Sequence, residues 1–141
     1  MKNDRLLVTL DDPYAQALGL ALFCFARLEW DAVHCCEKMK PGFINDLGRR
    51  TAGMIAAELI QLASARPDWS TVEAQCLEFK RLVVVRNEIM HGKPGSLGAE
   101  REQRLFHLGS PWTIEKVNKA ADEFTACQIH VNDFLHKVLS N

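Results

Sequence analysis

The chain has 141 residues, of which 48% are apolar and 25% are charged. This composition is typical of one ordinary globular domain and excludes a disordered or fibrous chain. The 17 Lys and Arg residues nearly balance the 18 Asp and Glu residues, for a formal charge of −1. We therefore do not expect binding of nucleic acid along a whole basic face, and any such role must rest on a small local site.

The cysteines and the most apolar segment indicate a cytoplasmic protein. The five cysteines are an odd number and form no CxxC pair, which is typical of reduced thiols in a core. Residues 15–28 are strongly apolar, but this run is shorter than the ~20 residues of a membrane-spanning helix. Arg27 lies near its end, and Glu29 and Asp31 follow it. We therefore expect no membrane-spanning segment.

Four segments with helical periodicity account for most of the chain, and Pro or Gly clusters separate them. The expected helices span about residues 13–39, 44–65, 71–91 and 113–139. Asp12 is the predicted N-cap of the first helix, and Ser70 to Glu73 form a predicted capping box at the start of the third. The segment 92–112 contains QRLFHL, which fits either a short strand or a helical turn.

The apolar seams of these helices predict the fold class. The last helix has the longest seam, with apolar residues at alternating spacings of three and four and one polar member, Gln128. Long helices with one seam each favour a single all-α domain over residues 1–141, arranged as an antiparallel four-helix up-and-down bundle.

The first helix carries more apolar surface than one small bundle can easily cover. Leu18, Leu22 and Phe25 lie on one stripe, whereas Leu20, Phe23 and Trp30 lie on others. The surplus face could pack on a second copy of the chain, which predicts a homodimer. A central helix buried within one chain would explain the same pattern equally well.

The most informative stretch is RNEIMHG, over residues 86–92, at the end of the third helix. Asn87 and His91 are four positions apart and share a helix face. Arg86 and His91 are five apart, about 140° on an ideal helix, so they would not point to the same place. If the helix ends at His91, however, the imidazole is free of strict helical geometry. The three side chains could then line one shallow cleft.

An Arg followed by Asn and, after three more residues, by His, near the end of the third of four helices, resembles the Arg-x4-6-His signature of HEPN domains. These all-α domains generally dimerise, and many are metal-independent endoribonucleases of toxin–antitoxin and phage-defence systems. The resemblance implies that Arg86 and His91 are the catalytic pair and that Asn87 is the polar residue after the arginine. It also implies that two motifs meet across a homodimer, with an RNA substrate, a cognate antitoxin or other partner protein, and no metal or cofactor.

The same residue types suit RNA cleavage on chemical grounds alone. Attack of a 2′-hydroxyl on the adjacent phosphate needs a base, an acid for the leaving 5′-oxygen and positive donors for the phosphorane. An imidazole exchanges protons near neutral pH, so His91 could serve as base or acid. Arg86 presents a planar fork of donors to phosphate oxygens, and Asn87 could orient the imidazole or the substrate. Lys93, beside the motif, is a predicted additional phosphate contact.

Structural roles could also explain these residues. Arg86 could pair with a buried carboxylate such as Glu58, Asn87 could satisfy a helix end, and His91 could cap the last carbonyls of its helix. Some members of the HEPN family do not cleave RNA. The alternative function is therefore a catalytically inactive dimerisation or binding module, and a third possibility is an unrelated helical protein with an accidental RNxxxH.

Other candidate sites are weaker. The run HCCE at residues 34–37 has metal-binding residue types, but consecutive helix positions point about 100° apart, so at most two could meet one ion. No metal site is predicted. The basic pairs Arg49-Arg50 and Lys80-Arg81 could touch an RNA backbone, although exposed helix faces explain them as well.

Overall fold

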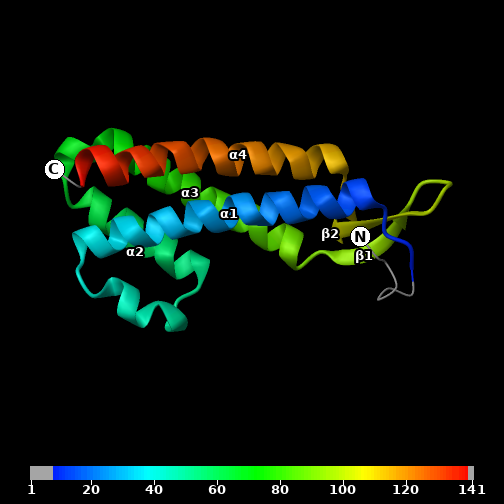
Figure 1. Cartoon of the computed structure of the whole chain (residues 1–141), viewed down its shortest axis with the longest axis horizontal. Helices are drawn as coiled ribbons and strands as arrows, with labels where there is room; N and C mark the ends of the chain where they lie inside the picture. The colour runs from blue at the N-terminus through cyan, green and yellow to red at the C-terminus, as the bar shows by residue number, and fades with distance from the viewer. Residues whose placement is uncertain (1–7, 140–141) are drawn as a thin grey trace.

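The computed structural model describes residues 8–139, most of which are helical (Figure 1). The long elements are α1 (Asp12–Met39), α2 (Ala52–Ser64), α3 (Ser70–Met90) and α4 (Ile114–Asp133). Short 3-10 turns, η1 (Phe43–Arg49) and η2 (Pro67–Trp69), precede α2 and α3, and a π-helical turn, η3 (Phe134–Val138), continues α4. The prediction of a mainly helical fold is therefore confirmed. Within the described residues, no helix has both the length and the hydropathy needed to cross a membrane.

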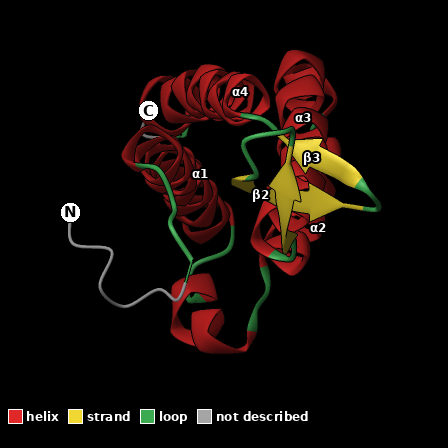
Figure 2. Ribbon diagram, turned by 90° about the vertical axis from the view of Figure 1, so that its right-hand side faces the viewer, coloured by secondary structure: helices red, strands yellow, loops and turns green. Residues whose placement is uncertain are grey.

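A small sheet lies between α3 and α4, so the prediction of an all-α fold was wrong in this segment. The strands β1 (Lys93–Leu97), β2 (Glu102–His107) and β3 (Ser110–Trp112) pair antiparallel in the order β1-β2-β3. Leu108 and Gly109 turn the chain between β2 and β3 with φ of 48° and 79°, the backbone of a tight hairpin. Of the two alternatives for QRLFHL, the strand is confirmed. Viewed from this end of the molecule, the sheet lies in front of α3 (Figure 2).

The helices also do not alternate in direction as the up-and-down prediction required. Asp31 of α1 accepts a hydrogen bond from Gln128, and the Cys35 thiol donates to the backbone carbonyl of Val131, so α1 and α4 run parallel. Only α3 runs the other way (Figure 1). The physical reason is the segment 40–51, which returns along the side of the molecule before α2 begins. The connection between α1 and α2 is therefore a crossover rather than a tight turn.

The predicted helix over 44–65 is divided in the structure. Gly42, with φ of 93°, starts η1, and the Glu37 carboxylate accepts hydrogen bonds from the backbone N–H groups of Gly42 and Ile44. The chain is then extended at Arg50, and the Thr51 hydroxyl accepts from the backbone N–H of Met54 at 3.2 Å to start α2. The two caps on either side of this break explain why the periodicity is not one continuous helix.

Two predicted helix starts also differ from the structure. The N-cap of α1 is Asp11 rather than Asp12, because its carboxylate accepts from the backbone N–H of Tyr14 at 2.9 Å. The capping box at Ser70 does not form. Residues of η2 lead directly into α3, so Ser70 is already helical, and its N-cap Trp69 makes no side-chain cap.

The core lies where α1, α3 and α4 meet. The ring of Phe25 packs against Phe79 of α3 and Phe124 of α4, with centroids 6.1 and 5.2 Å apart, and all three are buried. The predicted seam of α4 is confirmed along most of its length: Val117, Ala121, Phe124, Gln128, Val131 and Leu135 are buried. Its one polar member, Gln128, donates to the Asp31 carboxylate at 2.7 Å. This hydrogen bond compensates for burying the amide.

The cysteines occupy the places expected of core thiols. Cys35, Cys36, Cys76 and Cys127 are free and buried. Burial raises the pKa of Cys76 to about 11 and that of Cys36 to about 12, so these thiols stay protonated at neutral pH. They are therefore packing groups rather than nucleophiles.

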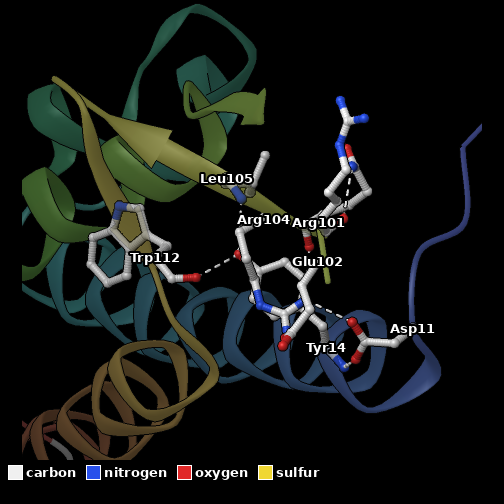
Figure 3. Close-up of polar contacts among 8 residues, drawn as sticks. Asp11, Tyr14, Arg101, Glu102, Arg104, Leu105 and Trp112 are labelled. Atoms are coloured by element: carbon white, nitrogen blue, oxygen red, sulfur yellow. Dashed lines mark hydrogen bonds and ion pairs between the residues drawn. The ribbon is translucent and has the colours of Figure 1, made fainter. Parts of the chain in front are cut away.

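A tyrosine hydroxyl joins the sheet to the first turn of α1 (Figure 3). Tyr14 is fully buried, donates to the backbone carbonyl of Trp112 at 2.7 Å and accepts from the backbone N–H of Leu105 at 3.1 Å. The guanidinium of Arg104 lies 4.3 Å from the centroid of the Tyr14 ring. It also forms ion pairs of 2.6 Å with Asp11 and Glu102. One hydroxyl thus binds two strands at once.

Replacing Tyr14 with Phe keeps the ring beneath Arg104 but removes the hydroxyl. The backbone N–H of Leu105 and the carbonyl of Trp112 then lose their shared partner. We expect the free energy of unfolding, measured by urea denaturation, to fall by about 1–3 kcal/mol, the usual cost of an unpaired buried polar group. Amide exchange at Leu105 should become faster. A Tyr14→Phe protein as stable as the wild type would show that the hydroxyl does not hold the sheet.

The ion pair between Asp11 and Arg104, which lies beside Tyr14, can be tested through the pH dependence of stability. The hydrogen bond from Arg104 lowers the pKa of the Asp11 carboxyl below its ordinary value of 3.8. Because the pKa is lower in the folded state, the charged carboxylate stabilises the fold fully at a pH above the pKa of the unfolded chain. This contribution is lost as the pH falls through the pKa of the folded state. Asp11→Asn keeps a capping oxygen but removes the charge. The stability difference between wild type and Asp11→Asn should be constant between about pH 5 and 7 and shrink below about pH 4. A difference that does not change with pH would contradict this role.

Candidate functional site

A surface hollow of about 560 Å³ brings the predicted motif together with the start of α2. Its wall is formed by Glu29 of α1, by Arg50, Thr51, Ala52 and Gly53 at the start of α2, and by Arg86, Asn87 and His91 at the end of α3. Three of the four predicted site residues therefore line one hollow. The fourth, Lys93, is exposed at the start of β1 and is not part of this wall.

The end of α3 allows Arg86 and His91 to share the hollow. His91 is the C-cap residue, with φ of −98° and ψ of 10°, and its backbone N–H donates to the carbonyl of Asn87 at 2.9 Å. It lies just beyond the last helical residue, Met90, and is exposed. The ~140° separation of an ideal helix therefore does not fix the position of its imidazole.

A glycine makes the passage from α3 into the sheet possible. A Cβ on Gly92 would lie 2.9 Å from the Cβ of Leu105 and 3.1 Å from the backbone oxygen of Ile89. Neither atom is the end of a flexible side chain, so a larger residue would have to displace β2 or the last turn of α3. The position of His91 thus depends on the contact between Gly92 and β2.

Arg86 is held near the surface by contacts that leave donors unused. Its side chain is 18% exposed, and its guanidinium carbon lies 4.8 Å from the centroid of the Phe25 ring. Nη1 contacts the Met90 sulfur at 3.3 Å, while Nη2 lies 3.6 Å from Glu29, too far for a good hydrogen bond. Nε is buried and has no hydrogen-bond partner among the described residues. Because Nε is buried, Nη2 is the donor that remains for an anionic ligand.

Glu29, rather than the expected Glu58, is the carboxylate nearest to Arg86. Glu58 forms its ion pair with Lys40 at 2.9 Å. Burial raises the pKa of the Glu29 carboxyl above its ordinary value of 4.5, and the charge of Arg86 acts in the opposite direction. No motif in the sequence pointed to Glu29, because its place beside Arg86 results from the packing of α1 against α3.

Arg50 is a second cation in the wall, and the sequence pattern did not connect it with the motif at residues 86–91. It occupies the extended residue between η1 and α2, and its guanidinium carbon lies 4.2 Å from the centroid of the Phe43 ring. Its Nε is buried and, within residues 8–139, has no hydrogen-bond partner. In the sequence it was only half of the basic pair Arg49-Arg50. The break between η1 and α2, which periodicity did not predict, places it beside the motif.

The HCCE run has structural roles. The ring of His34 packs edge-on against Trp30, with centroids 4.8 Å apart, and the two cysteines are buried. Glu37 binds the backbone at the start of η1, which lowers the pKa of its carboxyl. In the part of the chain that the structure describes, no three His, Cys, Asp or Glu side chains are placed to hold a metal ion.

Comparison of the chain with protein-family models, with curated proteins and with solved structures gives no match. Its function must therefore be inferred from the chemistry of the hollow and from the resemblance of the motif at residues 86–91 to that of HEPN domains.

Two glycine substitutions test whether the close packing of Gly92 against β2 contributes to stability. Gly92→Ala should lower the free energy of unfolding by about 1–3 kcal/mol, because the added carbon overpacks the junction with β2. Gly19→Ala is the matched control, since a Cβ at that helical position would meet no described atom within 4 Å apart from its chain neighbours and the adjacent backbone of its own helix. Alanine favours a helix over glycine by up to about 1 kcal/mol. The midpoint temperature of thermal unfolding should therefore fall for Gly92→Ala and rise for Gly19→Ala. Shifts of the same sign in the two variants would refute the steric role of Gly92.

Proposed function

We propose that this chain is a metal-independent endoribonuclease of HEPN type that cleaves RNA at the hollow. One observation carries the proposal: Arg86, Asn87 and His91 line the same surface hollow, and within the described residues Nη2 of Arg86 has no polar contact shorter than the 3.6 Å to Glu29. If Arg86 had only a structural role, its guanidinium would be expected to form short hydrogen bonds with an internal carboxylate. An accidental RNxxxH would have no reason to open on a concave surface beside a second arginine.

The reaction would join the 2′-oxygen of one nucleotide to the adjacent phosphorus and break the bond from phosphorus to the next 5′-oxygen. A neutral His91 takes the proton of the 2′-hydroxyl, and a protonated imidazole gives a proton to the leaving 5′-oxygen. Arg86 donates to the non-bridging oxygens as negative charge builds on the phosphorane. Asn87 orients the imidazole or the strand. The products are a 2′,3′-cyclic phosphate and a free 5′-hydroxyl.

A homodimer would complete this chemistry. One copy supplies a single histidine to the hollow, whereas the acid and base roles are best divided between two groups. Exposed apolar side chains support an association of two copies: on α1, Leu20, Phe23 and Trp30 are 56%, 63% and 49% exposed. Met90, in the last turn of α3 beside the hollow, is 54% exposed. Pairing through these residues would bring two motifs toward each other.

The second candidate function is a catalytically inactive HEPN-like module that dimerises or binds a partner protein. Glu29 is the observation that favours it, because a carboxylate 3.6 Å from Arg86 would compete with a phosphate for the guanidinium. A toxin–antitoxin or phage-defence setting, with a cognate antitoxin or other partner protein, belongs to the nuclease proposal.

Incubation of the purified protein with total RNA in EDTA tests the proposal. The wild type should cut RNA and leave 2′,3′-cyclic phosphate ends. His91→Ala should lower the rate by about 10²–10⁴-fold through loss of acid–base catalysis, and Arg86→Ala by about 10²–10³-fold through loss of charge stabilisation. Sedimentation of the same preparations reports whether two copies associate.

The matched controls are His136→Ala and Arg66→Ala, which remove exposed residues that do not line the hollow. Both should cut RNA at the wild-type rate. Equal cutting by every preparation would indicate a contaminating nuclease. Absence of cutting by the wild type on a broad set of RNAs would favour the binding module.

A further inference from the structure

Arg50 is half-buried but, unlike the other largely covered arginines of the described chain, Arg86 and Arg104, it has no carboxylate partner. Ion pairs join Arg66 to Asp68, Arg81 to Glu78 and Glu123, Arg86 to Glu29, and Arg104 to Asp11 and Glu102. Within residues 8–139, no carboxylate lies within ion-pair distance of Arg50, although its side chain is half-buried. Partial burial of an unpaired charge is costly, which suggests that a ligand neutralises it.

The Arg50 guanidinium is also held in place before any ligand arrives. Its carbon lies 4.2 Å from the centroid of Phe43, a ring that is itself buried, and the Arg50 backbone N–H donates to the carbonyl of Leu47 at 3.0 Å. A guanidinium that is stacked on one face still presents its edge, where all of its N–H donors lie. Stacking therefore orients Arg50. Its Nε is buried, so the two Nη groups, which form no hydrogen bond within residues 8–139, are the donors left for the hollow.

The charges around the hollow favour a ligand with more than one anionic group, such as two phosphates. Arg50 lies between η1 and α2, whereas Arg86 lies on α3, and only one carboxylate, Glu29, lines the wall with them. The start of α2 adds the positive end of a helix dipole to the side on which Arg50 lies. The volume of about 560 Å³ is comparable with the sites of whole small ligands rather than of one phosphate.

We propose that Arg50 binds the phosphate adjacent to the one that is cleaved, so that the hollow holds two consecutive phosphates of a single RNA strand. This inference rests on the proposed function, in which Arg86 and His91 act on the scissile phosphate. The substrate is then a single strand at least three nucleotides long, and a dinucleotide, with its one internal phosphate, lacks the group that Arg50 recognises.

The test compares cleavage of a trinucleotide with cleavage of the dinucleotide that contains the same scissile bond. In the wild type, kcat/KM should be larger for the trinucleotide. Arg50→Gln should reduce the ratio of the two kcat/KM values by about 10–100-fold, as expected for the loss of a charge-assisted hydrogen bond. Arg50→Lys should restore part of the ratio, because it keeps the charge. Arg49→Gln is the matched control, since Arg49 is exposed and outside the wall, and it should leave the ratio unchanged.

Binding of a 2′-O-methyl trinucleotide, which cannot be cleaved, gives a second readout. For Arg50→Gln, the slope of log affinity against log salt should be less steep by about 0.7, the value for one phosphate contact on a single strand. An unchanged ratio and an unchanged slope in a folded, active Arg50→Gln protein would overturn the role of Arg50 and leave the nuclease proposal intact. A wild type that cuts neither oligonucleotide nor any other RNA would overturn the proposed function itself.

Discussion

The hydrogen bonds of one tyrosine hydroxyl connect distant parts of this molecule. Tyr14 lies in the first turn of α1, and its hydroxyl holds backbone groups of Leu105 and Trp112 on two different strands. Leu105 in turn packs against Gly92, the residue that follows His91. The place of the imidazole is therefore set partly by a contact at the far end of the sequence, through β2. Such an arrangement makes the small sheet a support for the site rather than an insertion into a helical fold.

The Arg86 side chain is firmly packed, but within the described chain its guanidinium forms only a weak hydrogen bond and a long ion pair. A phenyl ring, a thioether and a carboxylate at 3.6 Å fix its position. None of these contacts replaces the strong paired hydrogen bonds that a phosphate offers to a guanidinium. Glu29 adds a negative charge whose own ionisation is disfavoured by burial. Under the proposed function, a phosphate at the hollow would meet an arginine that is already oriented and whose contact with Glu29 is long, at 3.6 Å.

The sequence predicted those structural features that depend on residues close together in the chain. The end of α3 and the seam of α4 follow from neighbouring residues, Gly92 and the regular spacing from Val117 to Leu135, and both are confirmed. The capping box at Ser70 failed because Pro67–Trp69 already forms a turn that leads into the helix. The positions of Arg50 and Glu29 in the wall depend on the break before α2 and on packing between helices. Periodicity contains no information about either, and the parallel course of α1 and α4 was missed for the same reason. Of the sheet, the sequence offered only the strand at QRLFHL, as one of two alternatives.

The parallel pairing of α1 and α4 determines when this chain can fold during synthesis. Contacts such as that between Asp31 and Gln128 join residues that are 97 positions apart. The apolar face of α1 that faces α4 consequently has no cover until α4 has left the ribosome. Such long-range contacts are expected to slow folding and to expose the nascent chain to association with chaperones or with other chains. The hollow is lined by residues of α1, α3 and the start of α2, but the core against which α1 and α3 pack is complete only after α4 has been synthesised.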